Sequence, residues 1–114
     1  MSWKIEVYET PQGRGVVEEY IDSLQDATKA KLIHQIDLLK EFGPQLRMPN
    51  AKPVGNGLYE LRVRGREESR IIYAYIKRQT IYLLHGFTKK TSAIPRKDIQ
   101  VALSRKKEVE SSIT

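Results

Sequence analysis

Arginine side chains alternate along one predicted strand of the sequence. Arg62 and Arg64 are two residues apart in the predicted strand 58–64, so an extended backbone places both on one face. Arg70, on the next predicted strand, reaches the same face if the register of the hairpin allows it. A guanidinium binds a phosphate through two parallel N–H groups, which a lysine ammonium cannot do as well. The chemistry open to this face is therefore the binding of a phosphate group.

The same arginines also have acidic neighbours that can neutralise them. Buried cations are costly unless they are paired, and Glu60, Glu67 and Glu68 lie close in sequence. The face therefore either pairs internally with these carboxylates or opens to solvent and an external anion. The sequence leaves both interpretations open.

Further cations follow the last predicted strand and fill a long loop. Lys89 and Lys90 lie in the run 88–91, and Arg96 and Lys97 come shortly after it. This cluster is either a solvated basic turn or a patch that contacts phosphates. Residues 43–57 are rich in Gly, Pro and Asn and hold two cations, Arg47 and Lys52. Loops longer than about 12 residues are usually functional or mobile.

Other common kinds of catalytic site find no support. The chain has no cysteine, which excludes disulfides, thiol nucleophiles and thiolate zinc sites. Neither a paired-histidine motif nor a Gly-rich phosphate loop occurs, so we expect no metal and no cofactor. His85 lies in an apolar strand, where a lone histidine is more often structural than an acid–base group, and His34 lies within a predicted helix.

The charge of the chain is uneven. Of 114 residues, 20 are Lys or Arg and 14 are Asp or Glu, which gives a net charge of +6. Residues 1–50 carry six basic and eight acidic residues, and residues 51–114 carry fourteen and six. A basic half suggests a polyanionic partner, although solubility alone explains many basic domains. No stretch approaches the roughly 20 apolar residues of a membrane span, and no signal peptide is evident, so we expect a cytoplasmic protein.

Hydrophobic periodicity predicts a single α+β domain in residues 1–107, followed by a flexible tail in residues 108–114. The expected order is β-α-α-β-β-β-α, with a helical hairpin after the first strand. Ser23 and Asp26 suggest a capping box for the second helix, which Gly43 and Pro44 end. Short connections predict a small, curved and mostly antiparallel sheet.

The tyrosines of the strands are expected in the core, although one could stack on a base. The predicted segments are strands 2–8, 58–64, 70–77 and 80–88, and helices 17–24, 26–42 and 95–107.

Several motifs occur together in a fixed order. The runs are GLYELR at 57–62, RIIY at 70–73 and LLHGFTKKT at 83–91, followed by Ile94 and Pro95. The upstream run LRMP at 46–49 and the pair Lys52 and Pro53 precede them. This ordered set resembles the RelE/HigB toxin superfamily, and more narrowly its phage-derived HigB-type branch. The resemblance covers nearly the whole chain and implies a RelE-like fold.

The resemblance also implies a function. The chain would be the toxin of a type II toxin–antitoxin pair, a metal-independent mRNA endonuclease that acts on the ribosome and inhibits translation. Its partners would be mRNA, the ribosome and a helix-turn-helix antitoxin similar to HigA. By position, catalytic roles fall to Arg62, Arg70, Lys89 and Lys90. We expect RNA contacts from Lys52, Arg47, Arg64, Arg96 and Lys97.

The resemblance leaves the general acid and base unassigned. Many members of the superfamily carry a tyrosine, histidine or aspartate near the C-terminal end, and no residue after Lys90 has an obvious match. His85 is the candidate within the strand, and Asp98 lies on the last helix. Two rival interpretations remain. One is a non-enzymatic inhibitor with the same fold, as in the ParE toxins that poison DNA gyrase. The other is a regulator that binds nucleic acid through its phosphates.

Overall fold

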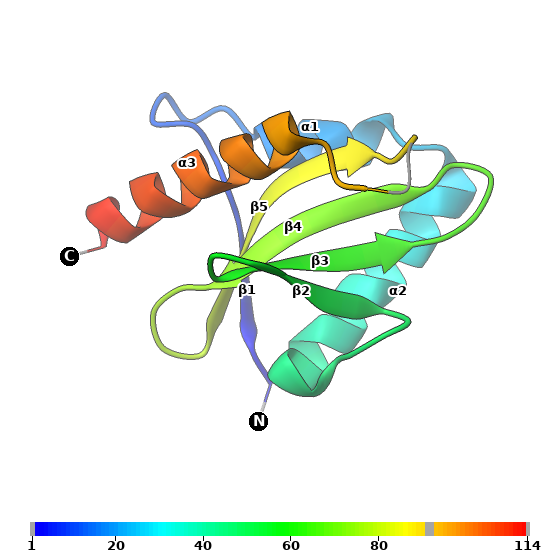
Figure 1. Ribbon diagram of the computed structural model, residues 1–114, viewed down its shortest axis with the longest axis horizontal. Coiled ribbons are helices and arrows are strands. Elements are labelled where there is room, and N and C mark those ends of the chain that lie inside the picture. Colours follow the sequence, from blue (N-terminus) through cyan, green and yellow to red (C-terminus); the bar gives the residue numbers. More distant parts are fainter. Residues whose placement is uncertain (1, 91–92, 114) are drawn as a thin grey trace.

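Helices and strands are arranged around one central sheet in the computed structural model, which describes residues 2–90 and 93–113 (Figure 1). The chain forms β1 (Lys4–Val7), α1 (Val16–Ser23), α2 (Asp26–Phe42) and the 3-10 turn η1 (Gly43–Gln45). It continues with β2 (Ala51–Gly55), β3 (Leu58–Val63), β4 (Ser69–Tyr75), β5 (Thr80–Thr88) and α3 (Arg96–Ser112). The predicted α+β class is confirmed.

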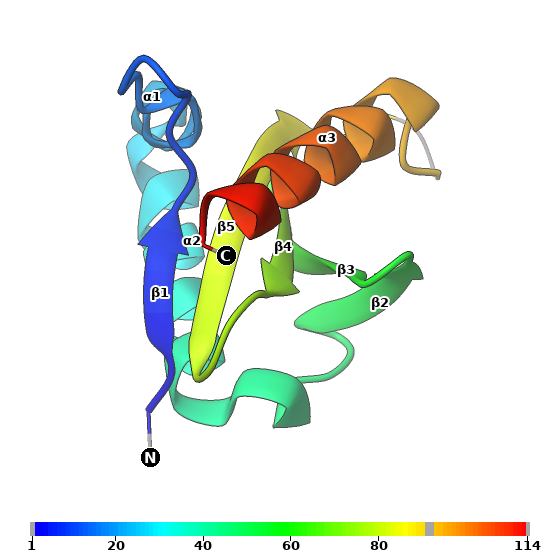
Figure 2. The ribbon, with the colours of Figure 1, turned by 90° about the vertical axis from the view of Figure 1, so that its left-hand side faces the viewer.

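The sheet is mixed and has the strand order β1-β5-β4-β3-β2. The pairs β2–β3, β3–β4 and β4–β5 are antiparallel, as the short connections predicted, whereas β1 runs parallel to β5. Helices α1 and α2 lie on one side of the sheet and α3 lies on the other (Figure 2). The central strands β3 and β4 are buried along most of their length, because both faces are covered there.

One strand was missing from the predicted order. Residues 51–55 were assigned to a loop but form β2, which pairs with β3 at the edge of the sheet. An edge strand tolerates Pro53, since its missing N–H need not join a second ladder. Asn56 and Gly57 connect the two strands with φ of 55° and 76°, the backbone that a tight two-residue hairpin requires. The Asn-Gly pair was therefore a hairpin signal.

The helix boundaries also differ from those predicted. Ser23 does not cap α2: its hydroxyl donates to the Tyr20 carbonyl at the end of α1, so the proposed capping box was wrong. Gly43 ends α2 as predicted, with φ of +52° and its N–H donating to the Leu39 carbonyl. A Cβ at Gly43 would lie 2.2 Å from Trp3 Nε1, so this position also requires glycine for space.

The last helix is longer than the sequence indicated. A helix end near Lys107 was predicted, with a tail beyond it, but α3 continues to Ser112. The added turn has anchors in the fold, since Val109 is buried and the Tyr8 hydroxyl donates to Glu108 Oε1 at 2.8 Å. These contacts extend the helix past the last residue of its obvious apolar stripe. Residue 114 lies outside the described residues.

Candidate functional site

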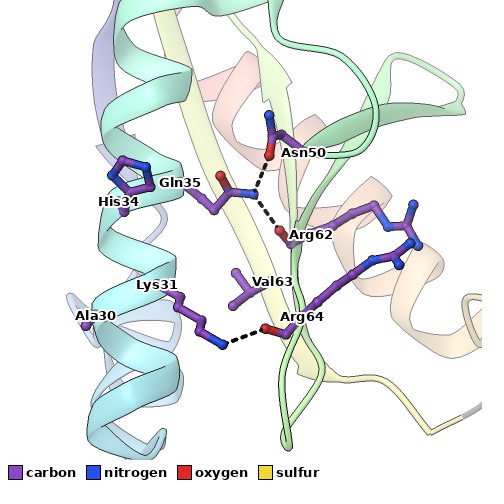
Figure 3. A pocket seen from close by; sticks show the side chains of 8 residues that line it. All are labelled: Ala30, Lys31, His34, Gln35, Asn50, Arg62, Val63 and Arg64. Carbon is purple, nitrogen blue, oxygen red and sulfur yellow. Dashed lines mark hydrogen bonds between the residues drawn. The ribbon is translucent and has the colours of Figure 1, made fainter.

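The pairing of β2, β3 and β4 brings several of the predicted site residues onto one face of the sheet. Arg62 lies directly opposite Arg70 in the β3–β4 ladder, and Lys52 lies opposite Glu60 in the β2–β3 ladder. Directly opposed residues share a face, so these four side chains are neighbours. Figure 3 shows the side chains of Arg62 and Arg64 pointing away from α2, towards the face that carries α3. The face predicted from the alternation of Arg62 and Arg64 therefore exists.

At the centre of this face lies a buried ion pair. The side chain of Glu60 is fully buried and that of Arg70 is 1% exposed. Arg70 Nε lies 2.6 Å from Glu60 Oε1, although its N–H does not point along the contact. The other guanidinium nitrogens donate to the carbonyls of Ser69 and Val63 and to Glu68 Oε2. Internal pairing, one of the two interpretations of this face, therefore describes Arg70.

Arg62 is held much less tightly than Arg70. Its Nε lies 3.9 Å from Glu60 Oε1, and its side chain is 11% exposed. Its Nη1 donates to the sulfur of Met48 at 3.2 Å. Arg62 Nε has no aligned hydrogen bond to any of the described residues. This Nε is buried, so an anion from outside can meet Arg62 only at its terminal guanidinium nitrogens.

Lys89 completes the group. It follows β5, and its backbone N–H donates to the Glu68 carbonyl at 2.7 Å, which ties this segment to the β3–β4 turn. Burial lowers the pKa of the Lys89 ammonium, and the charges of Arg70, Arg62 and Lys52 lower it further, whereas Glu60 opposes the shift. We call these five residues the Glu60 cluster: Lys52, Glu60, Arg62, Arg70 and Lys89. These four cations outnumber the two carboxylates near them, the buried Glu60 and the partly exposed Glu68 that pairs with Arg70, so positive charge predominates here.

The remaining predicted cations lie outside the Glu60 cluster. Lys90 and Lys97 line a small pocket of about 290 Å³ together with Phe87, Thr88, Pro95 and Asp98. Arg96 is exposed at the start of α3, and Thr91 lies outside the described residues. Arg64 is exposed, and its carbonyl accepts a hydrogen bond from Lys31 Nζ.

His85 has protein partners on both ring nitrogens. Its Nε2 lies 2.6 Å from Asp98 Oδ1 on α3, and Arg105 Nη1 lies 3.4 Å from its Nδ1. Its ring also stacks on Phe87. These contacts join α3 to β5 and favour a structural role for His85, so its acid–base role stays a prediction. Asp98, the other acid–base candidate, is engaged in the same pair.

Two pockets border the face, and each is lined in part by a residue of the Glu60 cluster, Arg62 in one and Lys52 in the other. One, of about 450 Å³, lies between α2 and β3, where Gln35 donates to the Arg62 carbonyl at 2.7 Å (Figure 3). The other, of about 490 Å³, is lined by Arg47, Met48, Lys52 and the tyrosines Tyr59, Tyr73 and Tyr75. Tyr73 is buried as predicted, and burial raises the pKa of its hydroxyl.

Glu60 is the residue whose importance the sequence alone understated. It was considered only as one of three possible acidic partners of the arginines. Its position two residues before Arg62, on the same face of β3, was the available signal. Groups of three or more acidic, histidine or cysteine side chains able to hold a metal ion are absent from residues 2–90 and 93–113. Within the same residues, no helix has the length and apolarity needed to cross a membrane.

A family model described as "Phage derived protein Gp49-like (DUF891)" matches residues 19–107, most of the chain. The chain belongs to this family. The Gp49-like family is toxin-like, occurs in toxin–antitoxin contexts and is related to toxin endoribonucleases. The match includes all five residues of the Glu60 cluster. A search of curated proteins finds no match to the chain.

Proposed function

We propose that this protein is the toxin of a type II toxin–antitoxin pair and that it cleaves mRNA on the ribosome. One observation carries the proposal: four cations, Lys52, Arg62, Arg70 and Lys89, converge on a single buried carboxylate on one face of the sheet. Membership of the Gp49-like family supports a toxin role and an antitoxin partner. The helix-turn-helix type of that antitoxin, the RelE-like fold and a place in the RelE/HigB superfamily are part of the same proposal.

The chemistry that such a cluster suits is attack of a ribose 2′-oxygen on the adjacent phosphorus. The 2′-hydroxyl loses its proton, the new P–O2′ bond forms and the P–O5′ bond breaks. The leaving 5′-oxygen then takes a proton, so the products are a 2′,3′-cyclic phosphate and a 5′-hydroxyl. The reaction needs a base, an acid and charge stabilisation at the phosphate.

Each role can be given to a residue of the cluster. Arg62, whose terminal nitrogens make one side-chain hydrogen bond, to the Met48 sulfur, would bind the phosphate oxygens through these nitrogens as their charge increases. Lys89 would accept the proton of the 2′-hydroxyl, because its lowered pKa increases the share of the neutral amine. Lys52, opposite Glu60 in the ladder, would donate a proton to the leaving oxygen. Arg70, which is buried, would act through Glu60 instead of touching the RNA.

The outer cations would follow the RNA backbone on either side of the cluster. We assign contacts with flanking phosphates to Lys90, Arg96 and Lys97 near the start of α3, and to Arg47 and Arg64 near β3. Such contacts position a strand without reading its sequence.

The test is induced expression in a bacterium followed by mapping of mRNA 5′ ends. Arg62→Ala is the test variant, and Arg78→Ala, at an exposed turn between β4 and β5, is the matched control. We expect new in-frame cleavage sites with the wild type and the control. Arg62→Ala should lower the cleavage rate about 10²–10³-fold. Arrested growth with intact mRNA would contradict the nuclease proposal and favour a gyrase target. Unchanged growth and mRNA would contradict the toxin proposal as a whole.

A further inference from the structure

We propose that Glu60 is the positioning residue of the Glu60 cluster: its buried carboxylate fixes Arg70 inside the fold and sets the position from which Arg62 meets a phosphate. This inference deepens the proposed nuclease function and rests on it. Its physical content, the placement of charges by Glu60, is measurable without RNA.

The two arginines make unequal contacts with the same carboxylate. Arg70 Nε lies 2.6 Å from Glu60 Oε1, and Arg62 Nε lies 3.9 Å from the same oxygen. Arg70 is further fixed by its hydrogen bonds to Ser69, Val63 and Glu68. The side-chain hydrogen bond of Arg62 goes to the Met48 sulfur, and sulfur is a weak acceptor. Arg70 is therefore fixed by more hydrogen bonds than Arg62, and Arg62 is the more exposed of the two arginines, with 11% of its side chain exposed against 1%.

The carboxylate itself is incompletely satisfied. Neither oxygen of Glu60 has an aligned hydrogen bond to the described residues, although the side chain is fully buried. A buried carboxylate without aligned donors costs free energy, so it persists here through its attraction to the surrounding cations. Glu60 therefore attracts Arg62 across 3.9 Å through its buried Nε, and leaves the terminal nitrogens of Arg62 out of the contact.

Removing the negative charge has a defined electrostatic consequence. The charged groups around Glu60 are Lys52 from β2, Arg62 from β3, Arg70 from β4, Glu68 from the β3–β4 turn and Lys89 after β5. The charge of Glu60 raises the pKa of Lys89, whereas burial and the neighbouring cations lower it. In Glu60→Gln, the pKa of Lys89 is therefore expected to fall below its value in the wild type.

The first measurement is an NMR titration of Lys89 in protein labelled at the lysine side chains. Glu60→Gln keeps the shape of the side chain and removes its charge, and Glu110→Gln, on the exposed side of α3, is the control. We expect the Lys89 midpoint to move to lower pH in Glu60→Gln and to stay unchanged in the control. An unchanged midpoint in folded Glu60→Gln would overturn the inference.

The second measurement is RNA cleavage as a function of pH. We expect Glu60→Gln to lower the rate about 10²-fold through misplacement of Arg62, and to move the acidic limb of the profile in the same direction as the Lys89 midpoint. A lower rate with an unmoved limb would mean that Glu60 has only a structural role. If Glu60→Gln does not fold, Glu60→Asp replaces it. The shorter carboxylate should keep the charge and most of the Lys89 midpoint but still slow cleavage, and a rate equal to the wild type would overturn the inference.

The two proposals fail in different ways. A wild-type protein that cleaves no RNA but shows the Lys89 shift in Glu60→Gln would refute the nuclease and leave the positioning role intact. Active cleavage without that shift would refute the positioning role and leave the nuclease.

Discussion

Replacing Arg70 by methionine should destabilise the fold strongly, because it leaves a buried charge without its close partner. Methionine keeps a long unbranched side chain and removes the guanidinium. Glu60, which is fully buried, then loses the cation at 2.6 Å and retains Arg62 at 3.9 Å. Breaking a buried ion pair in this way costs about 3–5 kcal/mol. This is the largest effect we expect from any single substitution in the cluster.

The size of that loss can be compared with the stability of the whole domain. At about 0.05–0.15 kcal/mol per residue, a chain of 114 residues has a free energy of unfolding of about 6–17 kcal/mol. The entropy of unfolding near the midpoint is about 0.24 kcal/mol/K for this length. A loss of about 3–5 kcal/mol therefore corresponds to a fall in Tm of about 13–21 °C.

Urea denaturation followed by the fluorescence of Trp3 measures this loss, since Trp3 is the single tryptophan and packs against the ring of Tyr75. Arg64→Met is the matched control, because Arg64 is exposed and should change stability by less than about 0.5 kcal/mol. The double variant Glu60→Gln with Arg70→Met should lose less than the two single variants together, by about 0.5–3 kcal/mol. A loss below about 1 kcal/mol in Arg70→Met would refute the reasoning, because the pair would then be solvated.

Three further predictions concern other parts of the molecule. Truncation after Lys107 removes the buried Val109 and the acceptor of the Tyr8 hydroxyl, so urea denaturation should show a loss of about 2–3 kcal/mol; no loss would mean a dispensable tail. Gly86→Ala places a Cβ 2.3 Å from the Tyr20 ring, and this strain should lower the free energy of unfolding by about 1–3 kcal/mol in a thermal melt. An unchanged melt would mean that α1 shifts to accommodate the methyl group at no cost. Because the pKa of Lys89 is lower in the folded chain than its ordinary 10.5, its charge opposes folding at pH 7 and that penalty disappears as the pH rises towards 10.5. Lys89→Met should thus be more stable than the wild type at pH 7 but similar near pH 10.5, and a less stable variant at pH 7 would contradict this sign.

Local sequence patterns predicted most of the elements because helices and strands repeat over a few residues. Strand 80–88 was predicted with its observed bounds, and β3 within one residue. Two of the errors had different causes. β2 was missed although the Asn-Gly pair at 56–57 is a local hairpin signal for its pairing with β3. The last turn of α3 depends on a distant contact, since Tyr8, a hundred residues away, binds Glu108, and no local pattern predicts that contact.

The sequence by itself determined that Arg62 and Arg64 share a face of a strand, because alternation is a property of any extended backbone. It also determined that the basic residues gather in the second half of the chain, and its ordered motifs led to the toxin hypothesis. These conclusions need only local geometry and counting.

Only the tertiary structure decided which of the arginines is buried and which residues surround Glu60. Register between strands places Arg62 opposite Arg70 and Lys52 opposite Glu60, and the β3–β4 turn holds Lys89 beside them. Register is set by packing of whole faces, since a shift of one residue would turn every side chain to the other side of the sheet. For this reason, only the packed sheet decides that Arg70 is fixed against Glu60 and that Arg62 is held less tightly. No segment of the chain decides this alone.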